Sequence, residues 1–401
     1  MRIAIIGGGI GGLTAALALR QFGFEPRVFE QAPELLEVGA AILMWPNAMR
    51  VLDRLGLADA VRQQGGILEQ GVSLDQHGKR LYQIRLPSTD LPAVALHRAD
   101  LQQILAQALP REAISLGRVF ANWEQPAETI VARFNDGSAI ETDVLVAADG
   151  LHSRAREQLL NDGPPAARGY IAWRGVAPNA PKRLPPAIAF EVLGRGQRFG
   201  IGPLGFGKVG WWASVNKRAR DGARETDPQG LPPEDPARTR EQLLRLFAGW
   251  CEPVEELIRA TPVTSIVRNP IFDRPPVKTW GEGSMTLLGD AIHPITPNLG
   301  QGGCLAIEDA ALLGRCLDKY VNHAPLGQGS VVQPALQRYA ALRTGRAAAI
   351  ARISRTYGVV GQWENRWAVG LRRTMLTLAP TLVVRPLLKW LFTYDAYAVE
   401  I

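Results

Sequence analysis

Apolar runs and helical patterns alternate at both ends of the chain. Residues 3–6 form an apolar run typical of a buried strand, residues 13–22 place apolar side chains at helical spacing, and residues 25–30 return to a strand pattern. Near the other end, an apolar run at residues 284–288 precedes a loop rich in glycine and proline and then a helical pattern at residues 304–313. This alternation predicts an α/β fold.

The middle of the chain follows a different pattern. Short strand-like runs alternate with loops there, at residues 170–176, 188–192, 198–201 and 209–215. Such a succession predicts a mainly antiparallel sheet, to which residues 71–95 add strands. We expect Trp173, Trp211 and Trp212 to lie in the core of this sheet rather than to line a pocket.

The first predicted turn carries the pattern GxGxxG, at residues 7–12. Gly7 permits a tight turn, Gly9 lets a pyrophosphate come against the backbone, and Gly12 lets the helix pack closely on the strand. Glu30 follows Gly12 by 18 residues, near the spacing of an acid that binds ribose hydroxyls. Together these features predict a dinucleotide-binding βαβ unit.

The same glycine pattern recurs at residues 200–205 with a different meaning. Pro203 lies inside it, and Gly207 and Gly210 follow closely, so a helix cannot begin there as the motif requires. We interpret this second match as a loop, which leaves the chain with one dinucleotide-binding unit.

A strand-like run at residues 141–148 ends at Asp149 and Gly150. A strand-to-helix turn capped by Ser153 would explain these residues without any ligand.

A third segment, residues 289–310, begins directly after the apolar run at 284–288. Asp290 can accept hydrogen bonds from a ligand hydroxyl, and His293 is expected to orient the turn. Gly300, Gly302 and Gly303 let backbone N–H groups approach a ligand at a helix N-terminus. The segment predicts a cradle for a planar, anionic molecule.

Composition narrows the class of protein. The chain has 401 residues, 46% hydrophobic and 21% charged, which is typical of a globular enzyme of two or three domains. Its net charge of +7 favours anionic cofactors or substrates, but no dense Lys/Arg block indicates nucleic-acid binding. The cysteines Cys251, Cys304 and Cys316 lack metal-ligand spacing, so we expect no metal site and a reducing compartment.

The ends of the chain bear on its location. The first strand pattern starts at residue 2, without the basic and apolar regions of a secretory signal, so the cytoplasm is expected. Residues 366–392 surround an apolar stretch at 375–384 that is about half of the ~18 residues needed to span a bilayer, and Pro380 interrupts it. No transmembrane segment is expected. A helix packed on the protein body is favoured, and attachment to a membrane surface is the alternative.

Residues 7–30, 143–156 and 289–310 together resemble the three motifs of single-component flavin monooxygenases, the aromatic hydroxylase family typified by p-hydroxybenzoate hydroxylase. They occur in the family's order and span most of the chain. Residues 38–48 and 300–304, with Cys304, are most similar to the subgroup that contains urate hydroxylase and zeaxanthin epoxidase.

The resemblance implies a non-covalently bound FAD. Its pyrophosphate and ribose would be held by Gly7, Gly9, Gly11, Gly12 and Glu30, with Arg98 reaching the cofactor and Val119 beside the adenine. Asp149 belongs to a motif for FAD and nicotinamide binding, and Asp290 would contact the ribityl or pyrophosphate portion. Along the isoalloxazine edge would lie Pro297, Gly300, Gly302 and Gly303. Arg198 matches an arginine of urate hydroxylase implicated in substrate or flavin contact, and it is the candidate pocket residue.

The resemblance also implies the activity. NADH or NADPH would reduce FAD, O₂ would form a flavin C4a-hydroperoxide, and one oxygen atom would pass to an aromatic or heteroaromatic small molecule. The substrate class stays open between benzoates or pyridines, purine-like rings, quinolones and polyketides, and no general base is identifiable. A flavin-dependent reductase, an alkene epoxidase and a non-catalytic flavin-binding protein are the alternatives. The protein would act as a monomer or homodimer.

The predicted organisation follows. A Rossmann-like FAD-binding domain is assembled from residues 1–70, 96–168 and 270–336, a mainly antiparallel β-sheet substrate domain from residues 71–95 and 169–269 is inserted into it, and residues 337–401 form C-terminal helices.

Overall fold

The structure is a computed structural model of the chain, and it describes all residues except 36–39, 127–128, 218–235, 324–330 and 379–383. Part of the 38–48 motif and part of the apolar stretch with Pro380 therefore lie outside the described residues.

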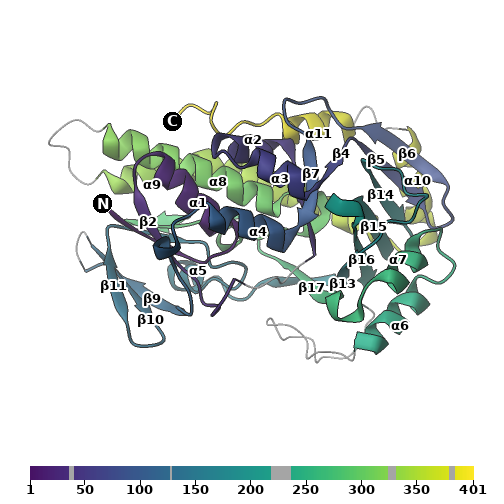
Figure 1. Ribbon diagram of the computed structural model, residues 1–401, viewed down its shortest axis with the longest axis horizontal. Coiled ribbons are helices and arrows are strands. Elements are labelled where there is room, and N and C mark those ends of the chain that lie inside the picture. Colours follow the sequence, from purple (N-terminus) through teal and green to yellow (C-terminus); the bar gives the residue numbers. More distant parts are fainter. Residues whose placement is uncertain (36–39, 127–128, 218–235, 324–330, 379–383) are drawn as a thin grey trace.

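A parallel sheet forms the centre of one half of the molecule (Figure 1). Its six strands are ordered β18 (Gly281–Glu282), β19 (Met285–Leu287), β12 (Val144–Ala147), β1 (Arg2–Ile6), β2 (Glu25–Phe29) and β8 (Ile114–Ser115). All neighbours are parallel except β18 and β19. Residues 3–6 are buried on both faces, which explains why β1 is an unbroken apolar run.

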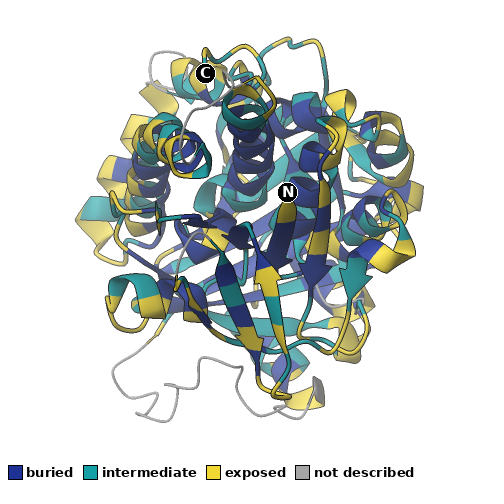
Figure 2. Cartoon of the chain, turned by 90° about the vertical axis from the view of Figure 1, so that its left-hand side faces the viewer, coloured by how far each residue is buried: buried dark blue, intermediate teal, exposed yellow. Residues whose placement is uncertain are grey.

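Helices cover this sheet, and Figure 2 shows that their inner sides are buried while their outer sides are exposed. They are α1 (Ile10–Gln21), α2 (Pro46–Arg54), α3 (Ala58–Gln64), α4 (Arg98–Gln107), α5 (Arg154–Leu160), α8 (Gly302–Leu317) and α9 (Val332–Gly361). Small residues let α1 and α8 approach closely: Gly11 lies against Ala306, and Gly314 against the backbone of Ala18.

A seven-stranded, mainly antiparallel sheet forms the other half. Its order is β17 (Val267–Asp273), β13 (Ala166–Ala177), β16 (Val209–Asn216), β15 (Gln197–Pro203), β14 (Ile188–Leu193), β5 (Gln70–Asp75) and β6 (Arg80–Arg85), and only β14 and β5 are parallel. Helices α6 (Pro236–Leu246) and α7 (Val254–Ala260) cover one face (Figure 1).

Two small antiparallel sheets complete the strands. One joins β11 (Ala139–Thr142), β10 (Ile130–Phe134) and β9 (Phe120–Glu124), and the other joins β3 (Ala41–Met44), β7 (Ala93–His97) and β4 (Gly66–Leu68). Short helical turns lie at η1 (Arg111–Ala113), η2 (Gly205–Gly207), η3 (Val263–Ser265), η4 (Gly289–Ala291), η5 (Pro297–Leu299) and η6 (Asp318–Asn322).

The chain ends in helices α10 (Arg366–Leu378) and α11 (Arg385–Phe392). In the part of the chain that the structure describes, no helix has the length and apolar character required to cross a bilayer.

The predicted fold class is confirmed: a dinucleotide-binding α/β half, a mainly antiparallel sheet and C-terminal helices are all present. The residue boundaries between the domains stay a prediction. The interpretation of residues 200–205 as a loop is wrong, because β15 continues to Pro203 and only the following residues turn. The glycines fit a strand because a Cβ at Gly200 would lie 2.0 Å from the indole nitrogen of Trp212.

Candidate active site

The turn between β1 and α1 requires its glycines. Gly7 has φ +107°, and a Cβ there would lie 2.4 Å from the carbonyl oxygen of Ala148. A Cβ on Gly12 would lie 1.9 Å from the carbonyl oxygen of Gly7. Both positions therefore exclude larger residues because the backbone leaves no space.

Gly9 differs, because no atom lies within 4 Å of the position its Cβ would occupy. Gly9 is the N-cap residue of α1, and no side chain caps the helix. The first N–H groups of α1 thus face open space, and this is the geometry of an anion site at a helix N-terminus.

Glu30 lies at the end of β2, beside the same turn. Its carboxylate accepts hydrogen bonds from Gly8 N (2.6 Å) and Ala32 N (2.9 Å). Its carbonyl oxygen accepts a bond from Arg118 N (2.8 Å), which brings the neighbouring Val119 to this edge of the sheet. Glu30, Val119 and the glycine turn therefore lie together, as the sequence predicted.

Asp149 follows β12 on the other side of the turn. Its carboxylate accepts bonds from Arg154 N (2.9 Å) and Ala155 N (3.3 Å), while Ser153 Oγ accepts one from Arg156 N (2.9 Å). Burial raises the pKa of Asp149 although these bonds oppose the shift. Asp149 thus stabilises the start of α5 through hydrogen bonds that need no ligand. Its backbone also lies next to Gly7.

The segment from Gly289 to the start of α8 forms a second wall. Gly300 has φ +61°, and Pro297 before it is exposed. A Cβ on Gly302 would lie 3.8 Å from Asp290 Oδ1, which places Asp290 beside the N-terminus of α8. The backbone N–H groups there and the Asp290 carboxylate therefore border the same space.

A buried charge cluster fixes this segment to α9. His293 Nε2 lies 2.5 Å from Asp309 Oδ2, and Arg343 Nε donates to Asp309 Oδ1 (2.6 Å). Arg343 and Arg346 both pair with Glu308 at 2.8 Å. Burial opposes ionisation, but the nearby positive charges lower the pKa of both carboxylates. His293 holds the turn, which agrees with the structural role expected for it.

Cys304 packs inside this wall. Its thiol accepts a bond from Trp45 N (3.5 Å) and donates to Leu43 O (3.4 Å). Burial raises its pKa to about 12, so the thiol stays protonated and is no nucleophile.

Asp290 lies where charged groups of the two halves approach each other. Its side chain is exposed, and yet burial raises its pKa, although the positive charges of His293 and Arg98 oppose this shift. Asp290 is thus reachable by water, while protein atoms surround it closely enough to disfavour its charged form. Arg98, at the start of α4, is exposed and close enough to act on Asp290 electrostatically.

Arg174 reaches the same region from β13. Burial, and secondly the positive charge of Arg98, lower its pKa. Among the described residues, Arg174 has no hydrogen-bond or ion-pair partner, while its side chain is half-buried. An unpaired, desolvated guanidinium is a site for an anionic or hydrogen-bond-accepting group.

Register shows which side chains share the face of Arg174. Arg174 pairs with Trp212, and Trp212 with Gly200; in the next row, Val176 pairs with Gly210 and Gly210 with Gly202. No atom lies within 4 Å of a Cβ position on Gly202. The sheet surface is therefore open at Gly202, two strands from Arg174, whereas the Trp212 indole covers Gly200 in the row of Arg174.

Trp212 lies on this face, half-buried, so the core position expected for it is wrong, whereas Trp173 and Trp211 are buried on the opposite face as expected. Successive residues of a strand point to opposite sides, and Trp211 and Trp212 therefore separate.

Arg198 lies on the same face, but it is only 1% exposed. Its guanidinium donates to Glu191 Oε1 (2.9 Å) and Asn298 Oδ1 (2.7 Å) and lies over the rings of Trp212 and Tyr357. Arg198 thus ties the sheet to η5, next to Pro297, rather than projecting into open space.

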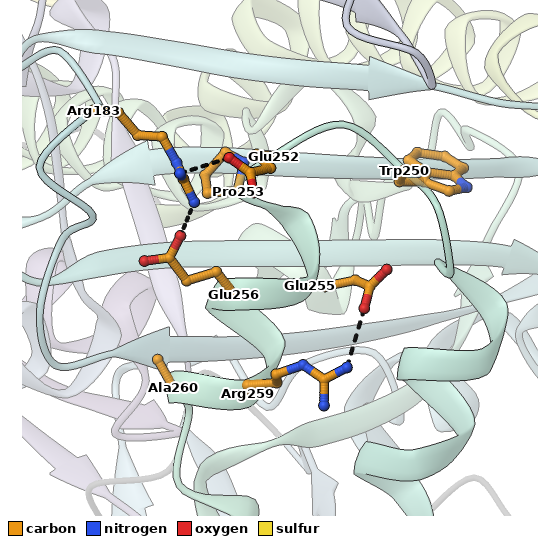
Figure 3. A pocket seen from close by; sticks show the side chains of 8 residues that line it. All are labelled: Arg183, Trp250, Glu252, Pro253, Glu255, Glu256, Arg259 and Ala260. Atoms are coloured by element: carbon orange, nitrogen blue, oxygen red, sulfur yellow. Dashed lines mark hydrogen bonds and ion pairs between the residues drawn. The ribbon is translucent and has the colours of Figure 1, made fainter.

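A separate cavity of about 670 Å³ lies on the outer side, at α7 (Figure 3). Its charged groups are paired with one another: Arg183 with Glu252 and Glu256, and Arg259 with Glu255. It lies on the covered face of the sheet, away from Asp290 and Arg174.

Comparison with known proteins agrees with this geometry. Residues 1–354 match the family described as FAD binding domain. The chain is 37% identical over 382 residues to aurachin C monooxygenase/isomerase of Stigmatella aurantiaca, covering 94% of each chain. It is 33% identical over 383 residues to the FAD-dependent urate hydroxylase of Klebsiella pneumoniae, covering 93% of this chain and 94% of that protein.

The chain belongs to the family of single-component FAD-dependent aromatic hydroxylases. Its similarity to Klebsiella pneumoniae HpxO, solved in complex with FAD and uric acid, has a TM-score of 0.85 at 30% identity and covers 97% of this chain and 96% of that one. The predicted family and its urate hydroxylase subgroup are confirmed.

In this flavin monooxygenase the structure brings together most residues that the sequence selected. The glycine turn, Glu30, Val119 and Asp149 lie at one end of the parallel sheet, and Asp290, Pro297 and Gly300–Gly303 lie around the N-terminus of α8. Arg174 was missed. The available signal was its place in an apolar strand, one position after Trp173, where alternation turns it away from the core.

Proposed function

We propose that the protein uses NADH or NADPH and O₂ to hydroxylate a largely apolar aromatic or heteroaromatic molecule that carries one anionic or hydrogen-bond-accepting edge. The observation that carries the proposal is the approach of charged side chains from the two halves: Asp290 and Arg98 come from the nucleotide-binding half and Arg174 from the antiparallel sheet, and the charge of Arg98 acts on both Asp290 and Arg174.

The residues of the first half suit FAD. The uncapped N-terminus of α1 and the open space at Gly9 would receive the pyrophosphate, and Glu30 would exchange its bond from Gly8 N for bonds from the ribose hydroxyls. Arg98 and Asp290 would contact the cofactor between pyrophosphate and ribityl. When bound, FAD supplies hydride acceptance and activation of O₂.

The start of α8 would stabilise charge on the ring system. Gly302 and Gly303 present backbone N–H groups at a helix N-terminus, where negative charge is favoured. Gly300 and Pro297 would lie along the same edge, and the cluster of His293, Asp309 and Arg343 holds this loop in place.

The substrate would lie on the face of the antiparallel sheet. Arg174 would bind its polar edge, and Gly202 would leave room for its ring. Apolar side chains surround this region, since Val176, Leu43, Trp45 and Leu86 pack in one cluster. Such walls exclude water, which protects the activated oxygen species from unproductive decay to H₂O₂.

The test is a coupled assay on the purified yellow protein. Oxidation of NADH and NADPH is followed with a panel of hydroxylated benzoates, hydroxypyridines, purines and quinolones, and products formed under ¹⁸O₂ are analysed by mass spectrometry. We expect one panel class to accelerate oxidation and to gain one labelled oxygen atom. Gly12→Val, whose side chain would overlap the backbone of Gly7, is the FAD-free control.

Reduction of a substrate without label in any product would support a flavin-dependent reductase instead. Label in an alkene rather than in a ring would support an epoxidase. Accumulation of H₂O₂ without product across the panel would contradict the proposed substrate class.

A further inference from the structure

Helix α10 presents a continuous row of large apolar side chains to solvent. Trp367, Leu371, Met375 and Leu378 are 74%, 55%, 54% and 76% exposed. They are spaced by four, four and three residues, which places them on one side of a helix. We call these four residues the α10 stripe. Large apolar side chains that lie together on a protein surface usually mark a site of contact with a membrane or another molecule.

A neighbouring side of α10 is attached to the body of the protein. Arg372 is 3% exposed and donates to the carbonyl oxygens of Gly361 (2.5 Å) and Gly194 (2.6 Å). These bonds join α10 to the end of α9 and to the turn between β14 and β15. Because they fix the rotation of the helix about its axis, the stripe faces outward as a consequence of the fold.

The sequence segment that carries the stripe has charges of one sign. The sequence from 366 to 392 contains five cations and no carboxylate; the cations are Arg366, Arg372, Arg373, Arg385 and Lys389. All except Arg372 are exposed. Arg366 stacks over the Trp367 ring at 4.8 Å, and Arg373 has a carboxylate partner, Asp75, at 3.6 Å.

We propose that α10 docks on the surface of an anionic phospholipid bilayer. The 13 residues of α10 extend about 20 Å, which is too short to span the ~30 Å hydrocarbon core, so the helix lies in the interface plane. The stripe enters the acyl region, and Arg366 and Arg373 of the same helix meet the lipid phosphates. A second aromatic, Trp390 of α11, is 43% exposed and suits the headgroup level.

Lipid is favoured over a protein partner because residues 366–392 carry five cations and no carboxylate in a chain of net charge +7. This charge complements anionic headgroups of any arrangement. The inference does not depend on the proposed oxygenation, because it rests on exposure and charge alone.

Cosedimentation of the FAD-loaded protein with phosphatidylcholine vesicles, with and without phosphatidylglycerol, tests the proposal. We expect binding to the anionic vesicles that weakens with added salt. Trp367→Ser combined with Leu371→Ser should lower the partition coefficient by about tenfold or more. Arg366→Gln combined with Arg373→Gln should lower it on anionic vesicles only.

Phe206→Ser is the matched control. Phe206 is 73% exposed, nearly as much as Trp367, but it lies in η2, at the other end of β15 from the Gly194 turn. Its loss should leave binding unchanged. Flavin absorbance and melting temperature verify that each variant is folded.

Equal binding of wild type and the stripe variant, or no binding to anionic vesicles, would overturn the proposal. A wild-type dimer in size-exclusion chromatography that Trp367→Ser dissociates would also overturn it, since the stripe would then bind a second copy of the chain.

Discussion

The two faces of the seven-stranded sheet are built from the same strands and differ in almost every other respect. Trp173, Trp211 and Phe199 pack on the face covered by α6 and α7, where the indole N–H of Trp211 donates to Thr261 Oγ1 (2.7 Å). The other face carries arginines, a glutamate and glycines. On the covered face apolar side chains fill the space, whereas on the other face the Arg174 guanidinium and the space at Gly202 are left open. Those two exceptions locate the proposed substrate position.

The open face itself contains two kinds of arginine. Arg198 is fully buried and has Glu191, Asn298 and two aromatic rings as partners. Arg174 is half-buried and has no such partner among the described residues. Residue type and place on the sheet therefore do not show what each arginine does. An arginine whose hydrogen bonds are all made within the protein positions other residues, whereas one with unused donors can bind a ligand.

Replacing Arg198 should have the largest effect. Arg198→Met leaves Glu191 partly buried without its counter-charge, so we expect a loss of about 3–5 kcal/mol in the free energy of unfolding. Urea denaturation measures it. Arg133→Met, which breaks an exposed pair with Glu124, should cost at most ~1 kcal/mol. Similar losses in the two variants would contradict the assignment of Arg198 as a buried tie.

Arg174→Met should affect turnover rather than stability. A hydrogen bond to a charged group contributes about 1.5–3 kcal/mol, so kcat/KM for the accepted substrate should fall roughly tenfold to a hundredfold. FAD affinity, measured by flavin fluorescence, should stay unchanged. Weakened FAD binding with unaltered KM would place Arg174 at the cofactor instead. Arg174→Lys should recover part of the loss.

The two glycines of β15 offer a smaller contrast. Gly200→Ala forces a methyl group against the Trp212 indole, and we expect a cost of about 1–3 kcal/mol. Gly202→Ala meets no atom within 4 Å and should change stability by no more than ~0.5 kcal/mol, while KM for the substrate rises. If Gly202→Ala leaves KM unchanged, the space beside Gly202 is not the substrate position.

Asp290 gives the smallest effect, which depends on pH. Burial holds the pKa of Asp290 in the folded apoprotein above its ordinary value of 3.8, so the unfolded state releases this proton first and stability falls as pH rises through that interval. Asp290→Asn should therefore melt like wild type below the interval and at a higher temperature above it. Scanning fluorimetry of the apoproteins from about pH 3 to about pH 8 measures this. A difference in melting temperature that does not change with pH would show that the pKa of Asp290 is not raised in the folded protein.

Sequence patterns predicted the elements that depend on residues close to one another in the chain. The turn at Gly7, the helix after it and the acid at the end of β2 follow from residues adjacent in the chain. Asp290 and the glycines before α8 were identified in the same way, because a strand end and a helix start bracket them.

Features that depend on long-range pairing were not predictable. Gly200 was interpreted as part of a loop because of Pro203 and the glycines that follow, and the sequence did not show that Trp212 of another strand covers Gly200. Arg174 could be identified as a candidate binding residue only from the pairing of β13 with β16 and from its electrostatic interaction with Arg98. The partners of Arg198, namely Glu191 and Asn298, are 7 and 100 residues away in the chain.

The charge cluster around Asp309 has a consequence for dividing the chain. Glu308 and Asp309 belong to α8, whereas Arg343 and Arg346, which neutralise them, belong to α9. A truncation or gene fusion that cut at residue 337 would leave two buried carboxylates without their positive partners. Each would lower the free energy of unfolding by about 3–5 kcal/mol. The long helix α9 is thus an integral part of the nucleotide-binding half, and any exchange of C-terminal residues has to leave it intact as far as Gly361, where it ends.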